Sequence, residues 1–260
     1  MVTIATCQLT PSFDKEARKK QLQDMLKRAM VQKADFVLFP EGFLTGYYEE
    51  EELARSNSLD VEEAAFFEWL ELVEKSAPET TVIVGFNERK GNALFNSAAV
   101  IENGRLLGIQ RKHHLYHSYF TAGNTFAVFE SKGVLFDVVI CLDTIYFEPA
   151  RVLALQNTSI LFSPMCNRVP LSHPYAQRPP YYSHFVARSF ENCCWLLSAD
   201  WVWPNDGVSI CPGHSAVYDP DGQEVIRSQE GEEDLLFVDI ARERIFHEKG
   251  GRVKNASVLF

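Results

Sequence analysis

The chain has 260 residues, of which 46% are hydrophobic and 23% are charged. This length and composition are typical of a soluble globular α/β protein, and they exclude a disordered chain, a collagen-like repeat and a coiled coil. The 25 Lys and Arg residues are outnumbered by 35 Asp and Glu residues, which gives a net charge of −10. Because an acidic chain with no strongly basic stretch repels phosphate backbones, we expect no nucleic-acid partner.

Membrane and disulfide signals are both missing from the sequence. No apolar run approaches the roughly 18 residues that a membrane span requires, and the N-terminal segment MVTIATCQLTPSF does not resemble a signal peptide. No CxxC pair or regular spacing occurs among the cysteines, which argues against a zinc site or a disulfide framework. We therefore expect a cytoplasmic protein with reduced thiols, no membrane contact and no cofactor. The six cysteines are Cys7, Cys141, Cys166, Cys193, Cys194 and Cys211.

The N-terminal third of the chain alternates strand and helix patterns. Residues 2–7, 35–39 and 81–86 are short apolar runs typical of strands. Between them, two segments carry apolar residues at helical spacing, and the acidic run at residues 49–52 is expected to be a solvated face. The helical positions are Leu22, Met25, Leu26, Ala29 and Met30 in the first segment, and Ala65, Trp69, Leu72 and Val73 in the second.

The remaining two thirds mix hairpins with strand–helix alternation. Asn103-Gly104 predicts a hairpin between residues 96–101 and 105–111, and Asp219–Gly222 predicts another between 215–218 and 224–227. This mixture implies a mixed sheet or a pair of sheets with helices outside. With no repeat and no linker, we expect one domain over residues 1–260. The other elements expected here are strands at 134–140, 159–165, 194–199 and 235–240, a helix at 149–156, and a helix that ends near Asn192.

Three reactive side chains follow three of the predicted strands. Glu41 follows the strand at 35–39, Lys112 follows the hairpin strand, and Cys141 follows the strand at 134–140. Reactive groups of α/β proteins gather beyond the carboxyl ends of strands, so we expect these three side chains to meet. A carboxylate, an ammonium and a thiol together form a coherent set for nucleophilic catalysis.

The roles of the three side chains follow from their chemistry. Cys141 is the candidate nucleophile, and a neighbouring cation and helix N-terminus would favour its thiolate. Glu41 can accept the thiol proton and later protonate a leaving amine. Lys112, with a backbone N–H after Cys141, can stabilise the tetrahedral oxyanion. Such a set suits attack on an amide or nitrile carbon.

Segments along nearly the whole chain resemble the carbon–nitrogen hydrolase, or nitrilase, superfamily. They are FPEGFLTGY (39–47), RKHHL (111–115), VVICLDTIYFEPAR (138–151), VARSFENCCWLLSAD (186–200) and GHSAVYDPDGQEV (213–225). The resemblance assigns the family's Glu base, Lys and Cys nucleophile to Glu41, Lys112 and Cys141. It also implies a four-layer α-β-β-α sandwich of two mixed sheets, an amidase-like branch, and a homodimer or higher homo-oligomer formed through a helical face.

The sequence departs from the family pattern after Lys112. The family usually has a second Glu in this loop, where it orients the Lys, whereas no Asp or Glu occurs here between Asn103 and Phe129. The matching position falls on Tyr116 or Ser118, whose hydroxyls can hydrogen-bond an ammonium but cannot balance its charge. The loop carries three histidines instead, but without a helical period we expect no metal site. The histidines are His113, His114 and His117.

Further candidates concern the substrate rather than the reaction. The stretch 166–182 is rich in Arg, Tyr and Pro, and it is either a rigid surface loop or a pocket wall whose arginines contact an acidic substrate group. Asp143 can instead form a structural ion pair or cap together with Arg151. The candidate substrate-binding residues are Tyr116, Ser118, Asp143, Thr144, Arg168 and Arg178.

The leading hypothesis is a metal-independent hydrolase of a small-molecule amide or N-carbamoyl group, acting through a thioester on Cys141. Nitriles are the less favoured substrates, because most branches of the family are amidases. A second hypothesis is a catalytically weak or inactive binding protein with the same fold, which the missing carboxylate favours. A third is a Cys–His thiol hydrolase that uses His113 or His114, although this leaves Glu41 and Lys112 without a role.

Overall fold

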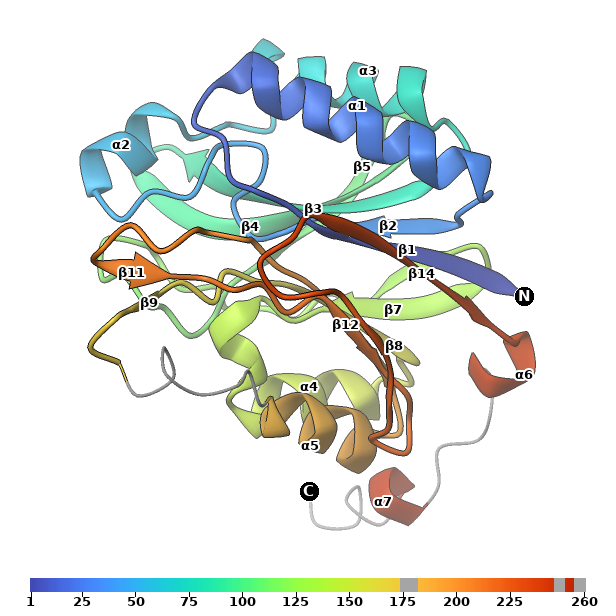
Figure 1. Cartoon of the computed structure of the whole chain (residues 1–260). Helices are drawn as coiled ribbons and strands as arrows, with labels where there is room; N and C mark the ends of the chain where they lie inside the picture. The colour runs from blue at the N-terminus through green and yellow to red at the C-terminus, as the bar shows by residue number, and fades with distance from the viewer. Residues whose placement is uncertain (174–181, 246–250, 255–260) are drawn as a thin grey trace.

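The computed structural model describes residues 1–173, 182–245 and 251–254. Two six-stranded sheets lie face to face, with helices α1 and α3 on the outer face of one sheet and α4 and α5 on the outer face of the other (Figure 1). This is the four-layer α-β-β-α sandwich of two mixed sheets that the family resemblance implies.

The first sheet joins the N-terminal part of the chain to its last strand. Its order is β14-β1-β2-β3-β4-β5, with β1, β2 and β3 parallel and the other neighbours antiparallel. The β4–β5 hairpin turns at Asn103 and Gly104, both at positive φ, as an Asn-Gly turn requires. The strands are β1 (Val2–Gln8), β2 (Phe36–Leu38), β3 (Thr81–Lys90), β4 (Ala93–Glu102), β5 (Arg105–Arg111) and β14 (Asp234–Ile240).

The second sheet is built from the middle of the chain. Its order is β13-β12-β10-β8-β7-β6, with β7, β8 and β10 parallel, and β9 pairs with β11 beside it. The strands are β6 (Phe129–Ser131), β7 (Val134–Val138), β8 (Ile160–Pro164), β9 (Val169–Pro170), β10 (Trp195–Ala199), β11 (Ser209–Ile210), β12 (Ala216–Tyr218) and β13 (Glu224–Arg227).

Helix α1 begins with a side-chain cap, whereas α2, α3, α4 and α5 begin without a side-chain cap hydrogen bond. Asp14 caps α1, because its carboxylate accepts the backbone N–H of Ala17 at 2.7 Å. None of the described helices is long and apolar enough to cross a membrane. The helices are α1 (Lys15–Val31), α2 (Glu51–Ser56), α3 (Ala64–Ser76), a 3-10 helix (Cys141–Thr144), α4 (Phe147–Leu155), α5 (Ser183–Asn192), α6 (Arg242–Ile245) and α7 (Gly251–Lys254).

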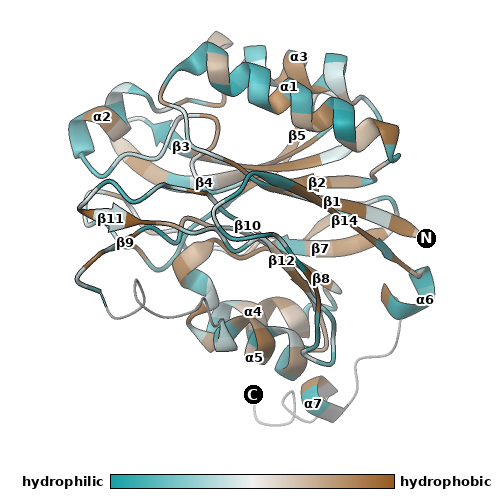
Figure 2. Ribbon diagram, in the orientation of Figure 1, coloured by the Kyte–Doolittle hydropathy of each residue, from teal (hydrophilic) through white to brown (hydrophobic). Residues whose placement is uncertain are grey.

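The main core lies between the two sheets. Phe36 of β2 places its ring 5.3 Å from that of Phe136 on β7 and 5.6 Å from that of Phe162 on β8. In β1, Val2 and Ile4 enter this layer, whereas the alternate residues pack toward α1. The central strands are therefore apolar on both faces, as strands covered on both sides are, and Figure 2 shows them as largely hydrophobic ribbons.

Several elements differ from the sequence-based prediction. The acidic run is exposed as expected, but part of it forms α2. The strand expected to end at residue 140 ends at Val138, and α4 begins at Phe147, two residues earlier than predicted. Strands β6, β9 and β11 were not predicted, because two or three residues are too few for a periodic pattern to show.

Candidate functional site

Cys141 lies at a strained turn between β7 and α4. It opens the 3-10 helix Cys141–Thr144 with φ at +46°, a left-handed conformation that a residue with a side chain rarely adopts. The hydroxyl of Thr144 donates to the Cys141 carbonyl at 2.7 Å, and the thiol points toward the carbonyl of Cys166 at 3.8 Å. Strain of this kind persists where the surroundings enforce it, and it is common at functional sites.

Arg188 of α5 holds the end of this turn. Its side chain is buried, and the guanidinium donates to the carbonyls of Thr144 and Ile145, each at 3.0 Å. A cation at these carbonyls favours the helical turn that carries Cys141. Arg188 therefore helps to position Cys141 without contacting it.

Glu41 follows β2 and is completely buried. Its backbone N–H donates to Met165 O at 3.3 Å, and the indole of Trp201 donates to its carbonyl at 2.8 Å. Gly85 of β3 passes so close that a Cβ there would lie 2.6 Å from the Glu41 Cα. The backbone of Glu41 is thus fixed by both sheets.

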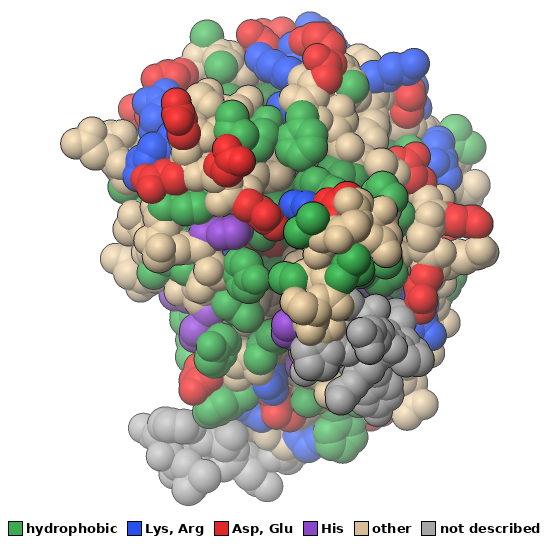
Figure 3. Space-filling view, turned by 60° about the vertical axis from the view of Figure 1, so that its left-hand side comes forward, with side chains coloured by type: hydrophobic (Ala, Val, Ile, Leu, Met, Phe, Trp, Pro, Cys, Tyr) green, Lys and Arg blue, Asp and Glu red, His purple; other side chains and the backbone are tan. Residues whose placement is uncertain are grey.

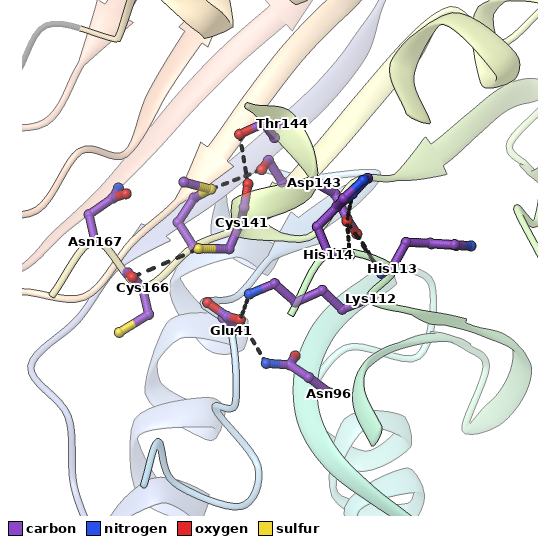
Figure 4. Close-up of polar contacts among 12 residues, drawn as sticks. Glu41, Asn96, Lys112, His113, His114, Cys141, Asp143, Thr144, Cys166 and Asn167 are labelled. Carbon is purple, nitrogen blue, oxygen red and sulfur yellow. Dashed lines mark hydrogen bonds and ion pairs between the residues drawn. The ribbon is translucent and has the colours of Figure 1, made fainter. Parts of the chain in front are cut away.

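The carboxylate of Glu41 meets Lys112 in a buried ion pair. Lys112 Nζ lies 2.6 Å from Glu41 Oε1, and Asn96 Nδ2 donates to the same oxygen at 2.7 Å (Figure 4). Lys112 is only 2% exposed. Because both donors use Oε1, Glu41 Oε2 has no hydrogen-bond partner among the described residues and remains available for a proton.

The resting Cys141 thiol keeps its proton. Burial and the negative charge of Glu41 raise its pKa to about 12, against the opposing charge of Lys112. The charge of Lys112 does lower this pKa, as expected from the sequence, but burial outweighs it. Burial opposes the charge on Lys112, whereas the carboxylates of Glu41 and Asp143 act in the other direction and raise the Lys112 pKa.

Asp143 is a second carboxylate that the sequence comparison of the loop overlooked. It is buried and accepts the backbone N–H of His113 at 3.1 Å and of His114 at 2.7 Å. Its charge acts on Lys112 without a direct bond. Lys112 thus lies in the field of two carboxylates, which partly offsets the missing second Glu.

Asp143 and Arg151 do not form the ion pair that was one expectation. Asp143 instead ties the Lys112 loop to the Cys141 turn. Arg151 donates to the carbonyls of Glu191 at 3.0 Å and of Arg252 at 3.2 Å. The two side chains belong to different networks because Arg151 faces α5 and the C-terminal segment.

Neither His113 nor His114 is paired with the thiol. His113 stacks on Phe126 with ring centroids 3.9 Å apart and points away from Cys141 and Glu41 (Figure 4). The His114 ring lies on Tyr146 and its Nδ1 is 2.8 Å from Asp143. The geometry therefore gives no support to a Cys–His pair.

The two residues proposed to replace the second Glu face outward. Tyr116 is 66% exposed, and Ser118 is also exposed. Between them, His117 turns inward and is half-buried against aromatic rings. Thr144 is buried, and its hydroxyl donates to the Cys141 carbonyl.

Arg168 lies at a pocket of about 490 Å³ that Phe13, Tyr47, Tyr48, Glu49, Glu50 and Leu53 also line. Its guanidinium is 3.1 Å from Glu49 and 3.0 Å from Asp206, and it stacks on Trp203. Two carboxylates already neutralise this arginine, so an acidic substrate group would have to compete with them. Figure 3 shows acidic, basic and histidine side chains gathered on this face. The other candidate, Arg178, lies outside the described residues.

Two residues of the site were missed by the sequence reading. Asn96 was placed in a strand but given no role, although the hairpin register puts Ser97 opposite Arg111 and Asn96 next to Lys112. The turn at Asn103-Gly104 alone would place Asn96 opposite Arg111, and a register shift between Val100 and Ile101 moves it next to Lys112. Arg188 offered no comparable signal, because its contacts join segments more than 40 residues apart. Within the described ranges, no cluster of side chains is suited to a metal ion.

Sequence and structure comparisons relate this chain to known proteins. A family model for carbon-nitrogen hydrolases matches residues 3–246. A nitrilase of Pyrococcus abyssi is 28% identical over 92% of this chain and 90% of its own length. An N-carbamoylputrescine amidase of Solanum tuberosum is 30% identical over 63% of this chain and 58% of its own. The crystal structure of an amidase from Nesterenkonia sp. has a TM-score of 0.80 at 21% identity, covering 100% of this chain and 96% of that one.

Proposed function

Because this chain belongs to the carbon–nitrogen hydrolase family, we propose that it hydrolyses an amide or N-carbamoyl group of a small molecule through a thioester on Cys141. The observation that carries the proposal is the buried Glu41–Lys112 pair beside that thiol. Glu41 acts as the base, and Lys112 stabilises the oxyanion.

In the first half of the reaction, the protonated thiol requires a base at the moment of attack. Glu41 Oε2 takes the proton while Cys141 Sγ bonds to the carbonyl carbon. Lys112 and the backbone N–H of Leu142 receive the charge that develops on the oxygen. Glu41 then returns the proton to nitrogen, the C–N bond breaks and an amine or ammonia leaves.

In the second half, water attacks the thioester carbon and Glu41 again accepts a proton. The acid departs and the Cys141 thiol is restored. Lys112 keeps its charge throughout, since the surrounding anions raise its pKa. It serves by position and electrostatics, and it exchanges no proton.

The relatives support an amide or N-carbamoyl substrate. The Solanum relative is named for its action on N-carbamoylputrescine. In a structure of a mutant of the Nesterenkonia amidase, acrylamide has added by Michael addition to that protein's active-site cysteine, so the cysteine of that protein is nucleophilic. The pocket at Tyr47 and Arg168, about 490 Å³ in volume, is our candidate for the substrate entrance.

The test is intact-protein mass spectrometry after rapid mixing with a panel of small amides, N-carbamoyl amines and nitriles. We expect an acyl adduct that disappears on standing, no adduct with Cys141→Ala, and no turnover with Glu41→Gln. Normal hydrolysis by Cys141→Ala would refute the mechanism. A binding protein without catalytic activity, the alternative that the missing Glu favours, would form no adduct with any compound.

We further propose that the protein is a cytoplasmic homodimer that pairs through the α4–α5 layer. Apolar side chains are exposed there, including Phe147 at 49% and Phe190 at 48%, and patches of this kind commonly mark interfaces. Light scattering after gel filtration should give twice the mass of the chain, and Phe147→Glu should reduce it to one chain. Phe67→Glu, at an equally exposed site on α3, should leave the mass unchanged.

A further inference from the structure

His117 presents an unused polar atom in the wall beside the catalytic pair. Its ring stacks on Tyr119 with centroids 5.2 Å apart and lies 6.2 Å from the ring of Tyr47, which lines the entrance pocket. The Nε2 atom is buried and has no hydrogen-bond partner among the described residues. A buried polar atom without a partner is costly in a folded protein, unless a ligand satisfies it.

The charges that act on this imidazole include both members of the buried ion pair. Glu49 and Glu41 favour its protonated form, while burial and Lys112 oppose it. Burial is the largest of these effects and lowers the pKa, so the imidazole is uncharged at neutral pH. Tyr47 packs against Gly42, the residue after Glu41, because a Cβ at Gly42 would lie 3.6 Å from Tyr47 Cδ2, so the Tyr47–His117 wall borders the reacting groups.

We infer that the uncharged imidazole of His117 accepts a hydrogen bond at Nε2 from the N–H of the substrate's departing nitrogen. This makes His117 a substrate-contacting residue on the loop that lacks the second carboxylate. The inference rests on the proposed amide hydrolysis and adds to it a discrimination between substrates.

The contact matters at one step of the reaction. As Cys141 Sγ bonds to the carbonyl carbon, the nitrogen lone pair must turn toward the proton on Glu41. A bond from the nitrogen's own N–H to His117 Nε2 fixes that orientation, and the C–N bond breaks once the proton has been transferred. His117 gains and loses no proton, and an ester, whose departing oxygen has no N–H, receives no benefit.

Other residues of the loop are less suited to this contact. Tyr116 and Ser118 are exposed, His114 is engaged by Asp143, and His113 points away from the reacting groups (Figure 4). Only His117 combines an inward position with a free acceptor among the described residues of this loop.

The test compares a small amide with its ester of the same acyl group, using single-turnover acylation of the full chain. His117→Phe keeps an aromatic ring for packing but removes the acceptor, and we expect it to slow acylation by the amide roughly 10-fold while leaving the ester unchanged. His117→Gln keeps an acceptor and should stay within about 3-fold of the wild-type amide rate. His113→Gln makes the same exchange at the ring that points away, and should alter neither rate.

The outcomes separate the two proposals. If the wild-type chain forms no acyl-enzyme with any amide, the proposed function fails and this inference fails with it. If the wild-type chain acylates but His117→Phe slows amide and ester equally, or slows neither, the hydrolase stands and the role of His117 is refuted. Thermal unfolding of each variant shows whether a loss in rate reflects a loss of fold.

Discussion

The Glu41–Lys112 pair allows a catalytic role to be separated from a structural one. Replacing Lys112 by Met removes the ammonium but keeps a side chain of similar length. Replacing Glu41 by Gln removes the charge and keeps the shape. The double variant removes both charges, so the three proteins form a mutant cycle around one ion pair.

The expected magnitude follows from the burial and the distance. At an effective dielectric constant of about 20, unit charges 2.6 Å apart attract by about 6 kcal/mol. Removing either charge leaves the other buried and unpaired, so each single variant should lose about 3–5 kcal/mol of unfolding free energy. The double variant should recover most of this, because no unpaired charge remains.

Urea unfolding followed by circular dichroism measures these free energies, and an amide assay measures turnover. We expect all three proteins to lose at least about 10²-fold in kcat, including the stable double variant. Its recovery of stability without recovery of activity would identify the pair as catalytic. Additive losses of stability would refute the reasoning, because they would show that the two charges do not compensate each other.

Four further predictions concern Lys112, Asn96, Gly85 and His214. Lys112→Arg should lower kcat by about 10²-fold, because a planar guanidinium does not replace a compact ammonium in a closed site; full activity would make Lys112 merely structural. Asn96→Ala should lower kcat/KM by about 10-fold through loss of the 2.7 Å bond to Glu41, whereas wild-type kinetics would show that Lys112 alone orients the base. Gly85→Ala should cost at least about 1–3 kcal/mol in urea unfolding, because its Cβ would lie 2.5 Å from Gly42 N; an unchanged midpoint would contradict the close approach. Burial lowers the pKa of His214 to about 3, so below about pH 6.5 the unfolded chain binds a proton that the folded chain does not, and stability falls as pH falls. Relative to His214→Gln, the wild-type chain should lose up to about 1.4 kcal/mol more per pH unit between pH 6 and 4, and equal slopes would exclude this origin.

The layered architecture and the three central site residues were accessible from the sequence. Apolar runs ended before Glu41, Lys112 and Cys141, and those ends do meet in the structure. Where a strand ends is a local property, and the pattern of apolar residues in the sequence indicates it. The hairpin at Asn103-Gly104 was equally clear, because a two-residue turn with positive φ leaves few alternatives.

The charge balance of the site could not be predicted from the sequence in the same way. Asp143 influences Lys112 across a gap of 31 positions in the chain, and only the folded backbone shows that it closes the Lys112 loop onto the Cys141 turn. The sequence displays the cation near Cys141 but does not display the burial that outweighs it and raises the thiol pKa. Interactions whose strength depends on how deeply a group is buried leave no periodic pattern in the sequence.

The proton retained by the Cys141 thiol also affects how fast this sulfur reacts with oxidants. Peroxide and electrophiles react with thiolates far faster than with thiols, and burial keeps this sulfur in the thiol form. Between turnovers, the nucleophile should therefore resist conversion to sulfenic acid, even though it is partly exposed. Peroxide oxidation of Cys141 at pH 7.5, followed by mass spectrometry, should be slower in the folded chain than in the urea-unfolded chain. A faster rate in the folded chain would mean that the resting sulfur is already ionised.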